Sequence, residues 1–439
     1  MKPIVLGLAV AWMATVAPMD AAAQSGGARP WSRVSFFTNS SETTASDGVK
    51  TKFTELTTAF AYQLPDEDRT RADFGVDLRY ATYASVVRPN RASIYEGFVG
   101  GRLANGRVRV RFGHVSLNDM GSLGALAGAT VELVQLRPTP DVGRLRLGFF
   151  GGLEPNILDT GYAPNVKKAG AYLVYEGVGA RRSSLGFANI RNGGMTERSV
   201  LTTTNFVPVG KKLFVFQSAE FDLQAPAGQA ERGLAYLFAT GRFQATDRLE
   251  LQGTYNRGRS VDARGLSEDI LAGRPVAQQT VDGLLYESIG GRVTVEALRR
   301  VRVYAGYSRD KNNRDTDPSG RTLVGGYASN IAGSGLDVSA SDSLLDRPGG
   351  SYHSRYVSVG RQVRRVVYVS GDVTTSLSVI RYSRSDGITV ETRPSTVRYS
   401  GTATINVGRS TTLLATVEHS TGDDYTEFRV LSGLTYRIR

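Results

Sequence analysis

The stretch Arg107-Val108-Arg109-Val110-Arg111-Phe112 alternates a charged residue with an apolar one at every position. A period of two is the pattern of a β-strand, because successive side chains of a strand point to opposite faces. The three arginines therefore share one face, and the apolar side chains share the other. This stretch predicts a strand whose two faces lie in chemically different surroundings.

The same alternation recurs between Asp73 and Tyr80, and again between Phe428 and Ile438. Short turns are expected at 104–106, 179–182, 209–212, 245–248, 297–300, 362–365 and 408–410. Longer connections, rich in Gly, Asp, Asn, Ser and Pro, are expected at 118–127, 154–166, 224–231, 259–280 and 311–321. Short turns that alternate with long loops are typical of outer-membrane barrels, with turns on the periplasmic side and loops on the extracellular side.

These patterns predict an all-β fold, a single transmembrane antiparallel up-and-down β-barrel of about 20 strands within a range of about 18 to 22. The range arises from two regions, Trp31 to Thr43 and Thr322 to Ser343. Including each region in the wall or excluding it changes the number of strands. In lipid, only a closed sheet leaves no unpaired backbone edge. The apolar faces are therefore expected to meet lipid, and the polar faces to line the lumen.

The N-terminus has the pattern of a secretory signal peptide. Lys2 precedes an apolar stretch from Ile4 to Ala17, and Ala21-Ala22-Ala23 fits a small-residue cleavage site. We expect a signal peptide over 1–23, a short segment over 24–30 and the barrel over 31–439. No later apolar run is long enough for a transmembrane helix. The sequence therefore predicts an exported protein of the bacterial outer membrane.

The composition narrows the classes of partner and chemistry. The formal net charge is +12, but the basic residues are dispersed and no helix-turn-helix, zinc or RNA-binding signature is present, so nucleic acid is not expected as a partner. An exported basic chain is more consistent with anionic solutes or lipopolysaccharide phosphates. The absence of cysteine excludes disulfides, a thiolate nucleophile and a cysteine-based zinc site. We expect neither a cofactor nor a metal.

The whole chain that follows the expected cleavage site resembles bacterial outer-membrane β-barrel proteins of the porin-like type, and it ends in the strand Glu427 to Arg439. Members of this class commonly finish on an aromatic residue, whereas this chain finishes on Ile438 and Arg439. The resemblance implies insertion by the barrel-assembly machinery and contact with outer-membrane lipid and lipopolysaccharide. It is generic, and it carries over no family's functional residues.

Arginines on polar strand faces are the main candidates for a functional site. The predicted pore-lining residues are Arg107, Arg109, Arg111, Arg144 and Arg146. A ring of arginine in a pore favours anions. The alternative is that lumen acids pair with these arginines and leave little net field. The candidate acids are Asp73, Asp77, Glu96 and Glu132.

The sequence favours a porin-like diffusion channel for small solutes, with a preference for anions if the arginines are not neutralised, working as a monomer or a homo-oligomer. One alternative is a non-conducting scaffold, adhesin or export component. Another is a lipid-modifying enzyme, because His114 and Ser116 resemble the His-x-Ser element of lipid A deacylases. Residues two apart on a strand are separated by about 7 Å, too far for a base to activate a nucleophile. We therefore expect no enzymatic activity.

Overall fold

The computed structural model describes residues 31–64, 72–84, 88–134, 143–156, 160–177, 179, 181–224, 232–315, 317–383 and 388–438. The predicted signal peptide and the 24–30 segment lie outside this part of the chain, as does Arg439.

Antiparallel strands make up almost all of the described chain. They are β1 (Trp31–Ala45), β2 (Lys50–Gln63), β3 (Ala72–Tyr83), β4 (Arg91–Leu103), β5 (Val108–Ser116), β6 (Ala125–Val134), β7 (Arg144–Pro155), β8 (Tyr162–Glu176), β9 (Arg182–Asn192), β10 (Met195–Val209), β11 (Leu213–Gln224) and β12 (Gly233–Thr246). They continue with β13 (Leu249–Ser260), β14 (Leu284–Leu298), β15 (Val301–Asn312), β16 (Ser319–Ala328), β17 (Leu336–Arg347), β18 (Gly350–Arg364), β19 (Val367–Ser383), β20 (Thr389–Thr392), β21 (Ser395–Val407), β22 (Thr411–Gly422) and β23 (Tyr425–Ile438).

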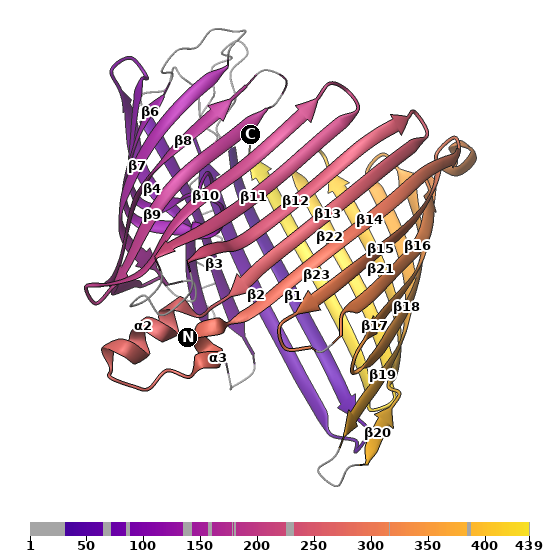
Figure 1. Cartoon of the computed structure of the whole chain (residues 1–439). Helices are drawn as coiled ribbons and strands as arrows, with labels where there is room; N and C mark the ends of the chain where they lie inside the picture. Colours follow the sequence, from indigo (N-terminus) through magenta and orange to yellow (C-terminus); the bar gives the residue numbers. More distant parts are fainter. Residues whose placement is uncertain are drawn as a thin grey trace.

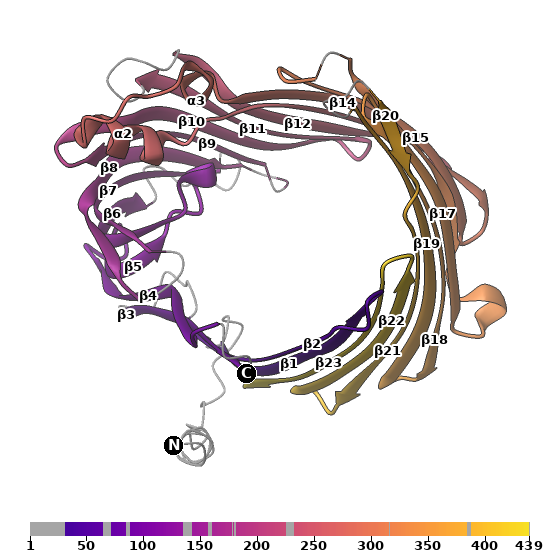
Figure 2. The same cartoon turned by 90° about the horizontal axis from the view of Figure 1, so that it is seen from below.

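The strands close into a ring, which Figure 2 shows from one end. Each strand pairs with its neighbour in the chain, and β1 pairs with β23 from Ser32 opposite Ile438 to Ala45 opposite Tyr425. The short β20 pairs only with the end of β19, beyond the residues of β19 that pair with β21. Of the 23 strands in the described residues, β20 therefore lies outside the wall, and 22 form it.

The fold class agrees with the prediction, but the best estimate of about 20 strands is too low. Both regions left open by the sequence belong to the wall. The first forms β1, and the second forms the hairpin of β16 and β17. That hairpin is rich in Gly and Ser, so its alternation is weak in the sequence although its backbone pairs fully with both neighbours.

Connections between strands lie at both ends of the wall. The register of β1 with β23 places the first residues of β1 and the last residues of β23 at the same end. The opposite end, which we call the outer end, carries the longest described connection, residues 261–283 with α2 (Ala263–Leu271) and α3 (Gln278–Asp282) (Figure 1). Within the described residues, no helix is both long enough and apolar enough to cross a membrane. The predicted asymmetry holds in part, because the two-residue turn Gly193-Gly194 also lies at the outer end.

The two faces of the wall differ as the alternation predicts. On β5, β6 and β7, Arg109, Glu132 and Arg146 are buried on the inner face, whereas Phe112, Val131 and Phe149 are exposed on the outer face. An exposed apolar outer face is the surface that a membrane barrel presents to lipid.

Aromatic rings on the inner face lie over glycines of the neighbouring strand. A Cβ at Gly75 of β3 would lie 2.6 Å from the ring of Phe98 on β4, and a Cβ at Gly148 of β7 would overlap the ring of Tyr172 on β8. Covering a strand glycine with an aromatic ring fixes the register of the pair and shields the bare backbone. These contacts fix the relative positions of the strands that carry the candidate site.

Candidate functional site

The connection between β5 and β6, residues 117–124, turns into the interior of the barrel at the outer end. It contains a short 3-10 turn, η1 (Gly121–Leu123), and it is closed by a hydrogen bond from the Leu117 N–H to the Gly124 carbonyl. Met120 is fully buried and lies over Gly186 of β9. We call residues 117–124 the inward loop.

An apolar patch on the inner wall holds the inward loop in place. Leu117, Met120 and Leu123 of the loop pack in one cluster with buried side chains of the wall. The wall side chains are Leu126, Phe150, Val166, Tyr172, Val174, Ala188, Ile190 and Val200. Burying apolar side chains in this way stabilises the loop by roughly 1.5–3 kcal/mol for each large side chain. Part of the lumen is therefore occupied by a firmly packed segment.

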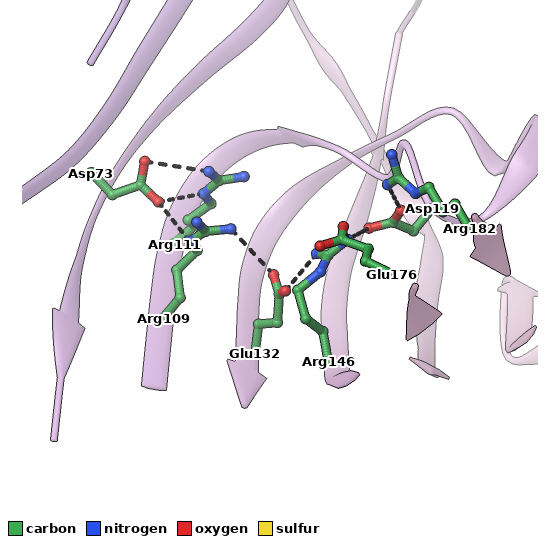
Figure 3. A network of polar contacts seen from close by, with 8 residues as sticks. All are labelled: Asp73, Arg109, Arg111, Asp119, Glu132, Arg146, Glu176 and Arg182. Carbon is green, nitrogen blue, oxygen red and sulfur yellow. Dashed lines mark hydrogen bonds and ion pairs between the residues drawn. The ribbon is translucent and has the colours of Figure 1, made fainter. Parts of the chain in front are cut away.

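A chain of ion pairs begins on the wall beside this loop (Figure 3). The Asp73 carboxylate of β3 lies 2.6 Å from Nε of Arg111 and 3.4 Å from Nε of Arg109. Arg109 Nη1 in turn donates to Glu132 Oε2 at 3.4 Å. Glu132 lies on β6, in direct register with Arg109 on β5.

The same chain of contacts continues through β7 to the inward loop. Arg146 Nη1 donates to Glu132 Oε1 at 2.5 Å, and Arg146 Nη2 donates to Glu176 at 2.9 Å and to Asp119 at 3.1 Å. Asp119 belongs to the inward loop and also accepts a hydrogen bond from Arg182 of β9. We call these eight residues, drawn in Figure 3, the ion network. It ties the inward loop to six strands of the wall, β3 and β5 to β9.

The far side of the inward loop is tied to the loop that carries α2. Lys168 of β8 donates to the Leu123 carbonyl at 2.9 Å and lies 3.3 Å from Glu154. Arg264 of α2 donates to Glu154 at 3.0 Å and to Glu197 at 2.6 Å. Partial burial opposes the charge of Arg264, but the bonds and attraction from Glu197 and Glu154 outweigh this and raise the pKa of its guanidinium.

A cavity of about 270 Å³ lies between the inward loop and the inner wall. Its lining includes five arginines, Arg109, Arg111, Arg144, Arg146 and Arg182, and three carboxylates, Asp119, Glu132 and Glu176. The cavity is thus polar, and its lining carries more positive than negative groups.

The predicted arginines are only partly brought together. Arg109, Arg111 and Arg146 lie in the ion network, each with carboxylates as partners. Arg144 lines the cavity opposite Glu176 in the register. Arg107 is exposed in the turn between β4 and β5, outside the network.

The predicted acids divide in the same way. Asp73 and Glu132 are central to the network, whereas Asp77 pairs with Arg79 at 3.9 Å and faces Glu96 in the register of β3 and β4. Sequence reasoning missed Asp119, Glu176 and Arg182. Strand alternation could have placed Glu176 and Arg182 on the inner face, but nothing in the sequence turns the loop with Asp119 inward.

The remaining part of the interior is reached by solvent. The side chains of Arg302, Arg398 and Arg429, on the inner faces of β15, β21 and β23, are 49%, 45% and 39% exposed. The side chain of Arg109, by comparison, is 5% exposed. One half of the lumen is therefore packed with protein, and the inner wall of the other half is wet.

His114 and Ser116 do not form a catalytic pair in the described contacts. His114 is buried on β5, and no hydrogen bond between it and Ser116 is present in the part of the chain that the structure describes. Over the same residues, no group of three or more His, Asp or Glu side chains is arranged to hold a metal.

A closed antiparallel wall, an apolar outer face and a polar, partly wet interior define a porin-like β-barrel of the bacterial outer membrane. Solved barrels of this kind resemble the chain in backbone outline. OpdQ of Pseudomonas aeruginosa is 8% identical, with 93% of this chain and 99% of that one covered at a TM-score of 0.43. OccAB4 of Acinetobacter baumannii is 9% identical, with 94% and 99% covered at a TM-score of 0.43.

The translocation pore of the P pilus usher PapC is 11% identical, with 93% of this chain and 100% of that one covered at a TM-score of 0.43. No protein-family model matches the chain, and no curated protein matches it in sequence. At identities this low, no residue role is carried over from these proteins.

Proposed function

We propose that the protein is a passive diffusion channel for small hydrophilic solutes across the outer membrane. The observation that supports it is the wet half of the lumen, where inward arginines of β15, β21 and β23 keep 39–49% of their side-chain surface exposed. Charged side chains on an inner wall keep this exposure only where water reaches them. Solutes would pass along these strands, beside the inward loop.

The proposal includes a preference for anions of modest size. The cavity at the inward loop is lined by five guanidinium groups and three carboxylates, and Asp73, which pairs with Arg109 and Arg111, adds a fourth carboxylate, so a positive excess of one group remains. A positive potential between low-dielectric walls raises the local concentration of anions. Ion pairing within the network limits this excess, so the expected selectivity is weaker than five unpaired arginines would give.

Planar-bilayer recording of the purified barrel tests the channel directly. We expect stable single-channel steps and, in a salt gradient, a reversal potential that corresponds to an anion-to-cation permeability ratio above unity. Arg182→Gln should move the ratio toward unity, most clearly at low salt, where screening is weak. Arg107→Gln is the matched control, because it removes the same charge from an exposed turn outside the network. Absence of conductance would favour the non-conducting scaffold instead.

Export and assembly form a separate part of the proposal. We infer a signal peptide over residues 1–23, cleavage after Ala23 and insertion by the barrel-assembly machinery. N-terminal sequencing of the outer-membrane form should therefore begin at Gln24. A mature chain that retains the apolar stretch from Ile4 to Ala17 would contradict this.

A further inference from the structure

A group of basic side chains lies on the outer face of the wall near the outer end of β13, β14 and β15. It consists of Arg257, Arg309 and Lys311, which we call the basic patch. Arg257 and Lys311 both face Glu287 in the strand register, and Arg309 lies two residues before Lys311 on the same face of β15. Arg257 belongs to β13 and the other two residues belong to β15, so the patch spans β14, which lies between these two strands (Figure 1).

The patch borders the apolar surface that meets lipid. On the same face, Ile289 lies in register with Arg309, and Tyr307 precedes it by two residues. Ile289 is 60% exposed and Tyr307 is 57% exposed. Lys311 is the penultimate residue of β15. Basic groups at a strand end, next to exposed tyrosine and isoleucine, occupy the level where lipid tails give way to headgroups.

The described chain balances the positive charge of the patch only in part, because three basic side chains lie beside one carboxylate, Glu287. Its nearby carboxylate, Glu287, accepts a hydrogen bond from the Tyr255 hydroxyl at 2.9 Å. Counting only described residues, neither Arg309 nor Lys311 has a carboxylate within ion-pair distance. Another outward basic pair at this end, Lys50 and Lys52, differs, because both lie within 3.2 Å of Glu42.

We propose that the basic patch binds the phosphate of a phosphorylated glycolipid in the outer leaflet. Guanidinium and ammonium groups are the usual protein partners of phosphate, and the neighbouring Tyr307 and Ile289 surface accommodates the acyl chains of the same molecule. A free phosphate ion would use only the charges, whereas a lipid uses both parts of the surface. This inference rests on the outer-membrane placement of the barrel and is independent of channel activity.

Native mass spectrometry of the delipidated full barrel in detergent, titrated with bis-phosphorylated lipid A, tests the proposal. Each basic side chain near an anionic lipid surface contributes a factor of about 5 to binding, so Arg309→Gln/Lys311→Gln should weaken lipid A binding about 25-fold. The charge-conserving pair Arg309→Lys/Lys311→Arg should retain most of the affinity. Binding by the unsubstituted barrel should fall as ionic strength rises.

Lys50→Gln/Lys52→Gln is the matched control, because it removes two outward positive charges at the same end from side chains that already have a carboxylate partner. It should leave lipid A binding unchanged. Heat-modifiable migration of every variant confirms a closed barrel. Equal losses in both double variants would overturn the assignment to the basic patch. Equal binding of dephosphorylated lipid A, or full competition by inorganic phosphate alone, would overturn the assignment to a lipid phosphate.

Discussion

Replacing Glu132 with glutamine tests whether the ion network stabilises the barrel. The Glu132 carboxylate is shared by Arg109 at 3.4 Å and Arg146 at 2.5 Å, and all three side chains are less than a tenth exposed. Removing one partner of a buried pair costs about 3–5 kcal/mol, because the remaining charge loses its compensation. Arg109 keeps Asp73, and Arg146 keeps Asp119 and Glu176. We therefore expect a loss of about 3 kcal/mol, at the lower end of this range.

Urea unfolding of the barrel in lipid vesicles, followed by circular dichroism, measures this loss. Glu418→Gln is the control, because Glu418 also pairs with an arginine on the inner wall, Arg429, at 3.6 Å, but in the wet half of the lumen. The side chains of Arg429 and Glu418 are 39% and 19% exposed, and Arg429 keeps Glu427 at 3.0 Å. Water-exposed pairs contribute at most about 1 kcal/mol, so losing this partly exposed pair should cost much less than losing the Glu132 pairs, and the variant should unfold close to the urea concentration of the unsubstituted barrel.

A double substitution measures the interaction between Glu132 and Arg146 separately from the other effects of each single substitution. Glu132→Gln/Arg146→Gln should cost less than the sum of the two single substitutions, because the second change removes a charge that the first left without its partner. If Glu132→Gln and Glu418→Gln destabilise the barrel equally, the reasoning from burial is refuted.

Three further predictions concern packing. Met120→Ala should leave a cavity that costs about 2–5 kcal/mol at the inward loop, and single-channel conductance should rise as the loop loosens. Gly148→Ala should lower the urea midpoint, at a cost of about 1–3 kcal/mol, because the added Cβ would overlap the Tyr172 ring. Gly151→Ala is the control and should leave the midpoint unchanged, because no atom lies within 4 Å of the added Cβ. Val110→Arg should cost about 2–4 kcal/mol if this side chain meets lipid near the midplane, and vesicle unfolding would show no such loss if it does not.

Alternation in the sequence predicted the two faces of the wall, because every second residue of a membrane strand meets lipid and must be apolar. Arg109 and Glu132 share the inner face for the same reason, so their pairing was among the alternatives that the residue pattern left open. The number of strands was harder to predict from the sequence. In the hairpin of β16 and β17 the backbone pairs regularly, but small and polar residues on both faces remove the contrast on which counting depends.

The inward loop could not be placed from local pattern, because its position depends on a surface formed by distant strands. Asp119 reaches Arg146 and Arg182 because Met120, the next residue of the loop, packs against β9. One signal was present in the sequence. From Ala169 to Tyr175 every residue except Gly170 is apolar or aromatic, so β8 has no polar face there. A membrane strand that is apolar on both faces requires something to cover its inner side.

The pairing of β1 with β23 sets an order on the folding of the chain. All other strand pairs of the wall join neighbours in sequence, so each can form by a short local search. The hydroxyls of Ser35 and Thr435, 3.2 Å apart, join residues separated by 400 positions. Contacts of such high sequence separation form slowly, because the loop that they close is long. Pairing of β1 with β23 should therefore be the rate-limiting step of barrel folding. Substitutions in these two strands that weaken their pairing should slow insertion more than substitutions in any hairpin of the wall.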